Sequence, residues 1–368
     1  ETLKDKNLEI GPWKIHPYGS TKFEYDDNVF LESDNEKEDF ITTISPGIRV
    51  ELPFNYEKSI FQLDYTADII CYSDYTDQSD EQHKISALLD TKFGDYSLTL
   101  KNVFRDFSDI ANTEFTQRVP REKNVASVKF GANFNRIRTE IMYENMDEDY
   151  RDFDELDRTD NVLTLTGYTR ILPKTDALLE YRYADISYDA AGSTRDGEYN
   201  QFCAGLKGEL AQKVSALIKA GYQNRDYDSA GKNSWKEPVV YAGLTYNISE
   251  PTLFNLSVER TAEESTYSSN NFYETNKSSM EISHKFGYKL TGKVGAFLQE
   301  NKYPEITTEG TESKKRDDDL HGFNIGLKYD IQKWLAAELE YKNSKRDSNF
   351  KDFDYNDNKV LLSISASF

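Results

Sequence analysis

Apolar and polar residues alternate with a period of two along almost the whole chain, the spacing of a β-strand whose two faces meet different surroundings. In the segment SIFQLDYTADIICY, Phe61, Leu63 and Tyr65 fall on one face, opposite Gln62 and Asp64. Counting every segment of this kind gives about eighteen strands, from a first strand at about residues 13–25 to a last one that ends at residue 368. The sequence therefore predicts an all-β protein.

The chain lacks a run of about 18 consecutive apolar residues, which a membrane-spanning helix requires. A transmembrane β-strand needs only about 9–11 residues with one apolar face, so a barrel can be hydrophilic overall. The composition is 37% hydrophobic and 13% aromatic, which leaves little aliphatic material for a large conventional core. Disordered chains are poor in aromatic residues, so this composition also argues against disorder.

The connections between the predicted strands alternate in length. Short turns such as Gly94-Asp95 and Asn135-Arg136 alternate with long acidic segments such as LESDNEKED at residues 31–39. Short periplasmic turns and long extracellular loops are typical of outer-membrane barrels. A β-sandwich gives no reason for this alternation, and a β-propeller would show a repeat of 40–50 residues.

We therefore expect a single closed antiparallel transmembrane β-barrel of about 18 strands over residues 13–368, in the outer membrane of a Gram-negative type of cell. Residues 1–12 are expected to be a periplasmic N-terminal segment, as in an exported, mature protein. An even number of strands returns both termini to the same side, which is the periplasmic side if the short turns are periplasmic.

The last strand, KVLLSISASF, ends abruptly on an aromatic residue. In hydrocarbon every backbone N–H and C=O must be paired, so a sheet spans the membrane only if its last strand pairs with its first. A C-terminal strand of this kind resembles the signal by which outer-membrane proteins are recognised for insertion, which implies the barrel-assembly machinery as a partner. The residues of this expected lipid-facing set and assembly signal are Val360, Leu362, Ile364, Ala366 and Phe368.

Several longer segments resemble the putative β-barrel porin 2 family. They are ITTISPGIRVELPF, FQLDYTADIICYSDYT, PKTDALLEYRYADISYD, LTYNISEPTLFNLSVERTAEEST and RDSNFKDFDYNDNKVLLSISASF. The resemblance covers nearly the full length, although it is spread over strand patterns and not concentrated in a catalytic motif. It implies a channel, and it implies as partners the periplasmic components of a secretion or exopolysaccharide-export system.

Polar positions on the expected inner face carry charges of both signs in near balance. A lumen of this kind suits hydrated polar solutes, including oligosaccharides, better than ions of one sign. The alternative is that these charges pair across neighbouring strands and only stabilise the wall. The candidate pore-lining residues are Asp64, Asp68, Lys101, Arg105, Arg138, Glu140, Glu180, Arg182, Lys219, Glu259, Lys293, Glu338 and Glu340.

Two other functions stay open. A non-conducting scaffold or adhesin barrel would act through its extracellular loops, of which KYPEITTEGTESKKRDDD at residues 302–319 is expected to be the longest. It could fold inward as a constriction or outward as a docking site. An outer-membrane enzyme would need His83 or His321 as a base beside acids such as Asp318, but no placed Ser nucleophile accompanies them. We therefore expect no enzyme.

The formal charge of −20 argues against nucleic acid as a partner and leaves outer-membrane lipid and lipopolysaccharide. The acidic segments at residues 147–160 and 352–358 are rich in hard oxygen ligands, but they lack the Gly and terminal Glu of an EF-hand. We predict no metal site and no cofactor; divalent bridging to lipopolysaccharide stays open. Cys71 is expected on the outer face and Cys203 on the inner face, unpaired.

Overall fold

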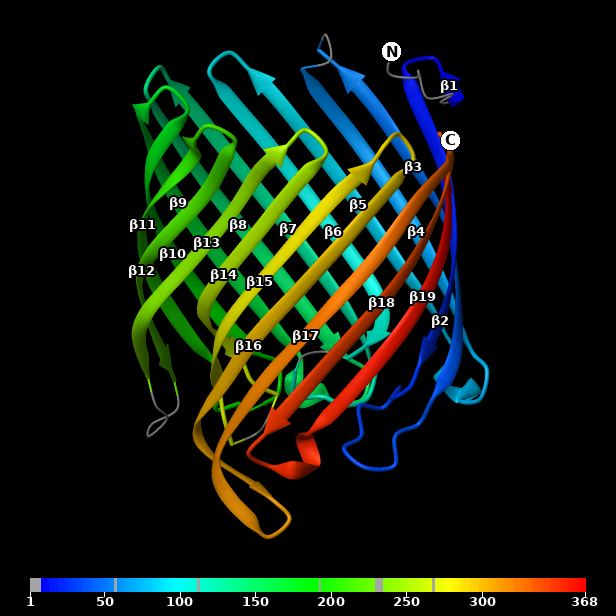
Figure 1. The fold of residues 1–368 in the computed structure, drawn as a ribbon. Coiled ribbons are helices and arrows are strands. Elements are labelled where there is room, and N and C mark those ends of the chain that lie inside the picture. The colour runs from blue at the N-terminus through cyan, green and yellow to red at the C-terminus, as the bar shows by residue number, and fades with distance from the viewer. Residues whose placement is uncertain (1–7, 56–57, 111–112, 192, 229–233, 267–268) are drawn as a thin grey trace.

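The structure is a computed structural model that describes residues 8–368, except residues 56–57, 111–112, 192, 229–233 and 267–268. Its strands form one antiparallel sheet, closed into the barrel of Figure 1. The strands are β1 (Leu8–Ile10), β2 (Trp13–Asp26), β3 (Asp39–Phe54), β4 (Ser59–Tyr72), β5 (Asp80–Phe93), β6 (Tyr96–Asp109), β7 (Val119–Phe134), β8 (Ile137–Tyr150), β9 (Arg158–Leu172), β10 (Thr175–Tyr188), β11 (Gly197–Ala211), β12 (Val214–Tyr227), β13 (Trp235–Ser249), β14 (Thr252–Glu264), β15 (Phe272–Phe286), β16 (Leu290–Glu309), β17 (Glu312–Gln332), β18 (Leu335–Ser348) and β19 (Tyr355–Ser367).

Eighteen of these strands, β2 to β19, make the wall of the barrel, and β1 adds a short hairpin to β2 through the pair Leu8 and Ile15. Three short 3₁₀ helices lie in loops: η1 (Thr76–Gln78), η2 (Asp154–Leu156) and η3 (Lys351–Phe353). No helix in the described residues is long and apolar enough to cross a membrane. The prediction of an all-β barrel with about eighteen strands is confirmed. The first seven residues of the predicted N-terminal segment lie outside the described residues.

The barrel closes because β19 pairs with β2 along its length. The antiparallel register runs from Lys359 opposite Asp26 to Ser367 opposite Tyr18. The final residue also takes part, since the Phe368 backbone N donates to the Pro17 carbonyl oxygen at 3.1 Å. The terminal strand is therefore paired up to its last residue, and neither edge of the eighteen-stranded wall is left free.

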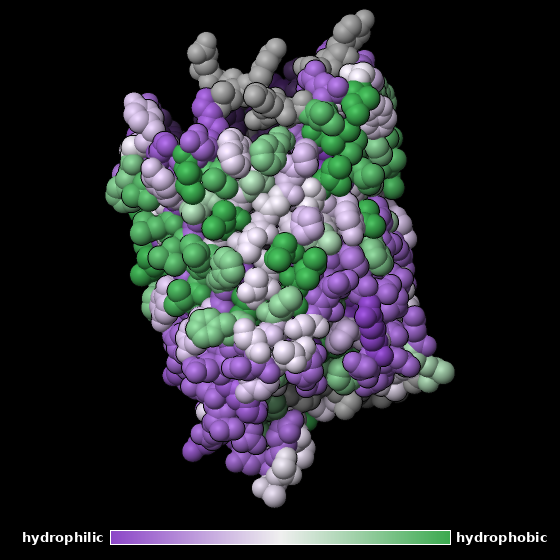
Figure 2. Space-filling model, turned by 90° about the vertical axis from the view of Figure 1, so that its right-hand side faces the viewer, coloured by the Kyte–Doolittle hydropathy of each residue, from purple (hydrophilic) through white to green (hydrophobic). Residues whose placement is uncertain are grey.

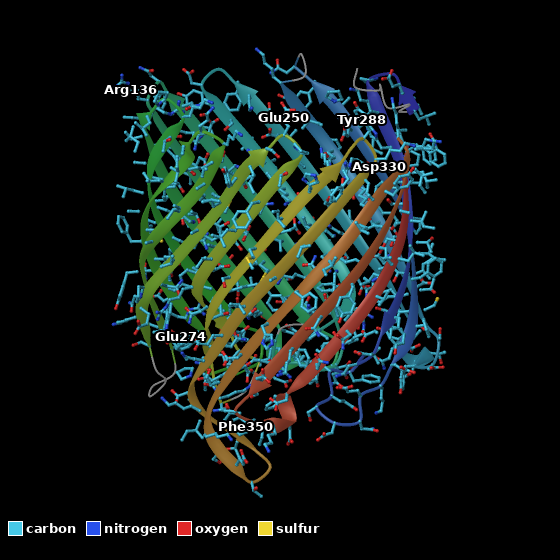
Figure 3. The ribbon with its side chains drawn as sticks, in the orientation of Figure 1. Arg136, Glu250, Glu274, Tyr288, Asp330 and Phe350 are labelled. Atoms are coloured by element: carbon cyan, nitrogen blue, oxygen red, sulfur yellow. The ribbon has the colours of Figure 1, made fainter. Side chains whose placement is uncertain are left out.

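The two ends of the barrel differ as the connection lengths predict (Figure 1). β1 and the C-terminus lie at the short-turn end, drawn at the top. Asn135 has a φ of 56° and Gly94 a φ of 61° in two of these turns, a backbone conformation that Asn and Gly adopt most readily. Figure 3 labels Arg136, Tyr288 and Asp330 at this end. We call the other end the long-loop end.

One predicted loop is not a loop. Residues 302–319 continue β16 and β17 as a hairpin that projects beyond the rim at the long-loop end (Figure 1), with its turn at Gly310. Ladder pairs such as Thr307 with Lys314 join the two strands of this hairpin. The side chains alternate as strand residues do: Arg316 and Asp318 are buried together, whereas Lys315 lies on the opposite face. The expectation that this segment is the longest loop was wrong.

The outward face of the wall is apolar. Figure 2 shows hydrophobic residues gathered over the upper and middle parts of the barrel and hydrophilic residues around the long-loop end. Tyrosine side chains on this face bond to neighbouring strands: Tyr143 and Tyr181 each donate a hydrogen bond at 2.6 Å to an asparagine on the next strand, Asn161 and Asn200. An amphipathic ring suits the boundary between hydrocarbon and polar headgroups.

The two cysteines are far from forming a disulfide. Cys71 is exposed and Cys203 is buried, and both are free. They belong to β4 and β11, which are not neighbouring strands. This agrees with the expectation that one thiol faces outward, the other inward, and the two remain unpaired.

Candidate functional site

All thirteen candidate pore-lining residues share one face of the sheet, the face opposite the exposed apolar side chains. Residues directly opposed in an antiparallel ladder point to the same side, and the register links Asp64 to Arg49 on one neighbouring strand and to Ser86 on the other. In a closed barrel this polar side is the lumen. The thirteen residues come from β4, β6, β8, β10, β12, β14, β16 and β18.

The structure brings several of these candidates together as ion pairs. Lys219 Nζ lies 2.9 Å from Glu180 Oε1, across two strands. Lys293 Nζ lies 2.6 Å from Glu338 and 3.3 Å from Glu340. These pairs join β10 to β12 and β16 to β18, each across one intervening strand, so they hold the wall over a longer span than the pairing of neighbouring strands in the alternative interpretation.

Other candidates pair differently or not at all. Arg138 and Glu140 lie 3.5 Å apart on one strand. Among the described residues, four candidates make no ion pair within 4 Å: Asp68, Lys101, Arg182 and Glu259. Two of these, Arg182 and Glu259, line a cavity of about 260 Å³ at the inner wall of β10 to β14. These two therefore place one charge of each sign, without an ion pair among the described residues, on the wall of the same cavity.

The odd-numbered strands of the wall and β2 also face the lumen, but the sequence interpretation took no candidate residue from them. Arg49 Nε lies 2.9 Å from Asp64 Oδ2, and the Tyr18 hydroxyl donates to Asp64 Oδ1 at 2.9 Å. Arg49 lies on β3, the neighbour of β4, and Tyr18 lies on β2, the next strand beyond β3. The same period-two rule applied to β2 and β3 would have found both residues.

A charged chamber of about 430 Å³ lies inside the long-loop end. Its wall holds five cationic side chains, four carboxylates and several tyrosines, so it is polar and almost neutral. Only Arg105 of this set was among the candidates. The charged lining residues are Arg105, Arg121, Lys123, Glu148, Arg158, Asp160, Arg225, Glu263 and Glu264.

Glu148 is the centre of the charge network in this chamber. Its carboxylate lies 3.2 Å from both Arg121 and Lys123 and 3.5 Å from Arg158, and the residue is only 5% exposed. Arg121 also lies 2.6 Å from Asp109 and Arg158 lies 3.6 Å from Asp160, so the three cations face three carboxylates and the network is close to neutral. Leu156 of η2 closes one side of the chamber. In the same loop, burial raises the pKa of the Asp157 carboxyl, which accepts a bond from the Tyr150 backbone N at 2.6 Å.

The loop between β6 and β7, residues 110–118, crosses the long-loop end to the opposite wall. Glu114 is 5% exposed and accepts hydrogen bonds from Ser265 Oγ at 2.6 Å and Thr266 Oγ1 at 2.7 Å. β6 and β7 lie about half-way round the eighteen-stranded sheet from β15. The loop therefore spans the opening, where Figure 1 shows loop segments lying across the lower end of the barrel.

Thr113 makes the second attachment of this crossing loop. Its hydroxyl accepts a hydrogen bond from Asn301 Nδ2 at 2.7 Å, and its carbonyl oxygen accepts one from the Arg346 guanidinium. Asn301 and Arg346 are both almost fully buried. We call these contacts, of Thr113 with β16 and β18 and of Glu114 with the β14–β15 loop on the opposite side, the latch. Sequence reasoning missed it, because nothing local in this stretch indicates a partner more than 150 positions away.

Comparison with known proteins agrees with this geometry. A family model described as putative beta-barrel porin 2 matches residues 8–368. The chain belongs to this family. No curated protein matches the sequence. The family resemblance predicted from the strand patterns is thus confirmed over nearly the whole chain, and the family is described as one of porins.

Solved porin structures have a similar fold. A BenF-like porin from Pseudomonas fluorescens Pf-5 is 10% identical with a TM-score of 0.56, over 98% of this chain and 100% of that one. OccAB3 of Acinetobacter baumannii is 13% identical with a TM-score of 0.53, over 98% and 100%. OpdK of Pseudomonas aeruginosa is 11% identical with a TM-score of 0.52, over 96% and 99%. At these identities the likeness shows the fold alone.

Proposed function

We propose that the chain forms a water-filled channel across the outer membrane that passes small hydrated polar solutes, with the latched loop narrowing its mouth at the long-loop end. A barrel of 16–18 strands leaves an aqueous lumen, which supports a channel. The latch supports the narrowed mouth, because the loop with Glu114 divides the opening of this lumen. We place the long-loop end on the cell surface and both termini in the periplasm, as in other outer-membrane barrels.

The charges of the lumen favour polar solutes without strong selection by sign. Most of the wall charges are neutralised in pairs such as Lys219 with Glu180, so their field is short-ranged. Arg182 and Glu259 offer one charge of each sign to a passing solute. Hydroxyl-rich solutes can exchange hydrogen bonds with such a wall at little net free-energy change.

Export of an oligosaccharide or exopolysaccharide is a finer possibility that the family resemblance suggested from the sequence. The family description and the names of the similar structures give no support for it. A polymer threaded through the lumen would also have to displace the latch, which holds Thr113 and Glu114 through several hydrogen bonds. We therefore propose passage of small solutes in preference to polymers.

Single-channel conductance in planar bilayers tests the proposal. The full chain, refolded in detergent, should give steady conductance steps in KCl, and these should shrink when small oligosaccharides that enter the lumen are added. Polymers too large to enter should leave the steps unchanged. Absence of conductance from protein that is folded by gel mobility would contradict a channel and favour a scaffold or adhesin that acts through its loops.

A further inference from the structure

Three carboxylates from the two ends of the chain meet at the seam where the barrel closes. One oxygen each of Asp26, Asp27 and Asp357 lies within 4.8 Å of the others. Asp26 ends β2, Asp27 begins the following loop, and Asp357 belongs to β19, which pairs with β2. The cluster thus forms only when the barrel is closed, at the long-loop end of the seam.

Two of the three carboxylates are oriented by hydrogen bonds. Asp27 accepts one from the Asn358 backbone N at 2.7 Å and one from Asn358 Nδ2 at 2.8 Å. Asp26 Oδ1 accepts one from the Asn28 backbone N at 2.9 Å. These donors come from the loop and from β19, so the positions of the oxygens are set by the closed fold and not by flexible side chains alone.

The burial and the incomplete hydrogen bonding of Asp357 point to a ligand. The residue is only 3% exposed, and within the described residues its Oδ1 has no hydrogen-bond partner. A buried carboxylate oxygen without a partner is costly. The Asp357 carboxylate also supplies one oxygen to the group formed with Asp26 and Asp27, so a cation bound among the three carboxylates would lie next to this buried side chain.

The charges around the cluster do not balance. Lys359 Nζ lies 2.6 Å from Asp26 Oδ2 and 3.3 Å from Asp357 Oδ2, and it also lies 3.9 Å from Glu24. Lys22 lies 2.7 Å from Glu24. Four carboxylates therefore face two ammonium groups, so with every group ionised the largely buried site carries an excess of two negative charges.

We propose that Asp26, Asp27 and Asp357 bind one Ca²⁺ ion. Calcium takes hard oxygen ligands in flexible geometry and fills its remaining positions with water. Asp27 is half-buried, so the site is open to solvent on that side. The ion would tie β19 to the start of the β2–β3 loop and so brace the outer end of the closing seam. This role is independent of whether the lumen conducts.

Calorimetric titration of the full chain with Ca²⁺ tests the site. The protein is refolded in detergent free of lipopolysaccharide, treated with chelator, and checked for folding by its heat-modifiable gel mobility. We expect one saturable Ca²⁺ per chain, and an affinity weaker by about tenfold or more in Asp357→Asn, because one ligand charge is lost. Asp154→Asn, in an exposed acidic loop, is the matched control and should bind as the wild type does.

Lys359→Met separates a cation site from a simple ion-pair network. If Ca²⁺ binds, removing the competing ammonium should strengthen Ca²⁺ binding and increase the Ca²⁺-dependent rise in the unfolding temperature. The proposal is overturned if the wild type shows no saturable binding, if Asp357→Asn binds Ca²⁺ as tightly as the wild type, or if Lys359→Met weakens binding. If Asp357→Asn fails to fold, the Ca²⁺ affinity of Lys359→Met still tests whether the site binds a cation.

Discussion

The two ends of the barrel are built from connections of different length, and the difference decides what each end can do. At the short-turn end, described turn residues bond only to neighbouring hairpins, as Lys174 does to Glu209 at 2.6 Å. At the long-loop end, Thr113 and Glu114 reach the opposite wall. An extended chain spans roughly 3.3–3.6 Å per residue. Because the chain must return to the adjacent strand, a loop reaches at most about half its contour length: a two-residue turn stays at its own wall, whereas nine residues reach roughly 15 Å over the lumen, where inward loops and long side chains of the other side can meet them.

The cavities at the two ends differ accordingly. The short-turn mouth has an open recess of about 670 Å³ beside β19, lined by His16, Arg49, Glu51 and Phe368 among others. The long-loop end encloses the smaller charged chamber around Glu148, with the latch near it. We infer that the short-turn end holds the wall closed and admits solutes freely, and that the long-loop end sets which solutes pass.

The largest expected difference between the ends is their accessibility on intact cells. A cysteine placed at Asp154, in η2 at the long-loop end, should react with a membrane-impermeant label, and one placed at Lys174, in a short turn, should not. The background should carry Cys71→Ser, because Cys71 is exposed. The reverse labelling pattern would invert the proposed orientation, and disrupted cells, where both positions should react, provide the control.

Deleting Phe368 should damage the short-turn end and with it the whole barrel. Its ring stacks on Trp334 at 5.3 Å, and its backbone N bonds to Pro17. We expect most of the folded protein to be lost from outer-membrane fractions, measured by heat-modifiable gel mobility. Deleting Thr311, at the tip of the projecting hairpin, should leave assembly intact. Normal assembly without Phe368 would contradict its role as an insertion signal, although β19 could still pair.

A smaller effect should distinguish the charge of the two mouths. Glu148→Gln removes the anion that three cations share, so the permeability ratio should shift toward anions by about a factor of two. Glu209→Gln, exposed at the short-turn end and paired with Lys174, should not change this ratio. The measurement is the reversal potential in a KCl gradient. Equal shifts in both variants would mean that the chamber does not control selectivity.

The wall could be predicted from the sequence because the alternation within each strand indicates which of its side chains face the lumen and which face outward. The period of two places Asp64 and Leu63 on opposite faces without knowledge of the neighbouring strands. The last strand could be predicted for the same reason. Its face of Val360, Leu362 and Ile364 is exposed in the structure, whereas Leu361 is buried.

The mouth could not be predicted, because it depends on contacts between distant residues. Glu114 meets Ser265 only after the sheet has closed, and no local pattern encodes that distance. The hairpin of β16 and β17 was misread because its many charges are typical of loops, although Arg316 and Asp318 alternate with Lys315 as strand residues do. The Asp26, Asp27 and Asp357 cluster likewise joins positions from opposite ends of the chain.

The channel with a latched mouth is tested most directly by removing the crossing loop. Asp109 and Val119 are directly opposed in the ladder, so a two-residue Asn-Gly turn can replace residues 110–118 without disturbing β6 and β7. We predict that single-channel conductance rises by about twofold or more because the opening is no longer divided. A variant shortened at Gly310 in the projecting hairpin should conduct as the wild type does. Unchanged conductance in the folded loop-replacement variant would contradict the account.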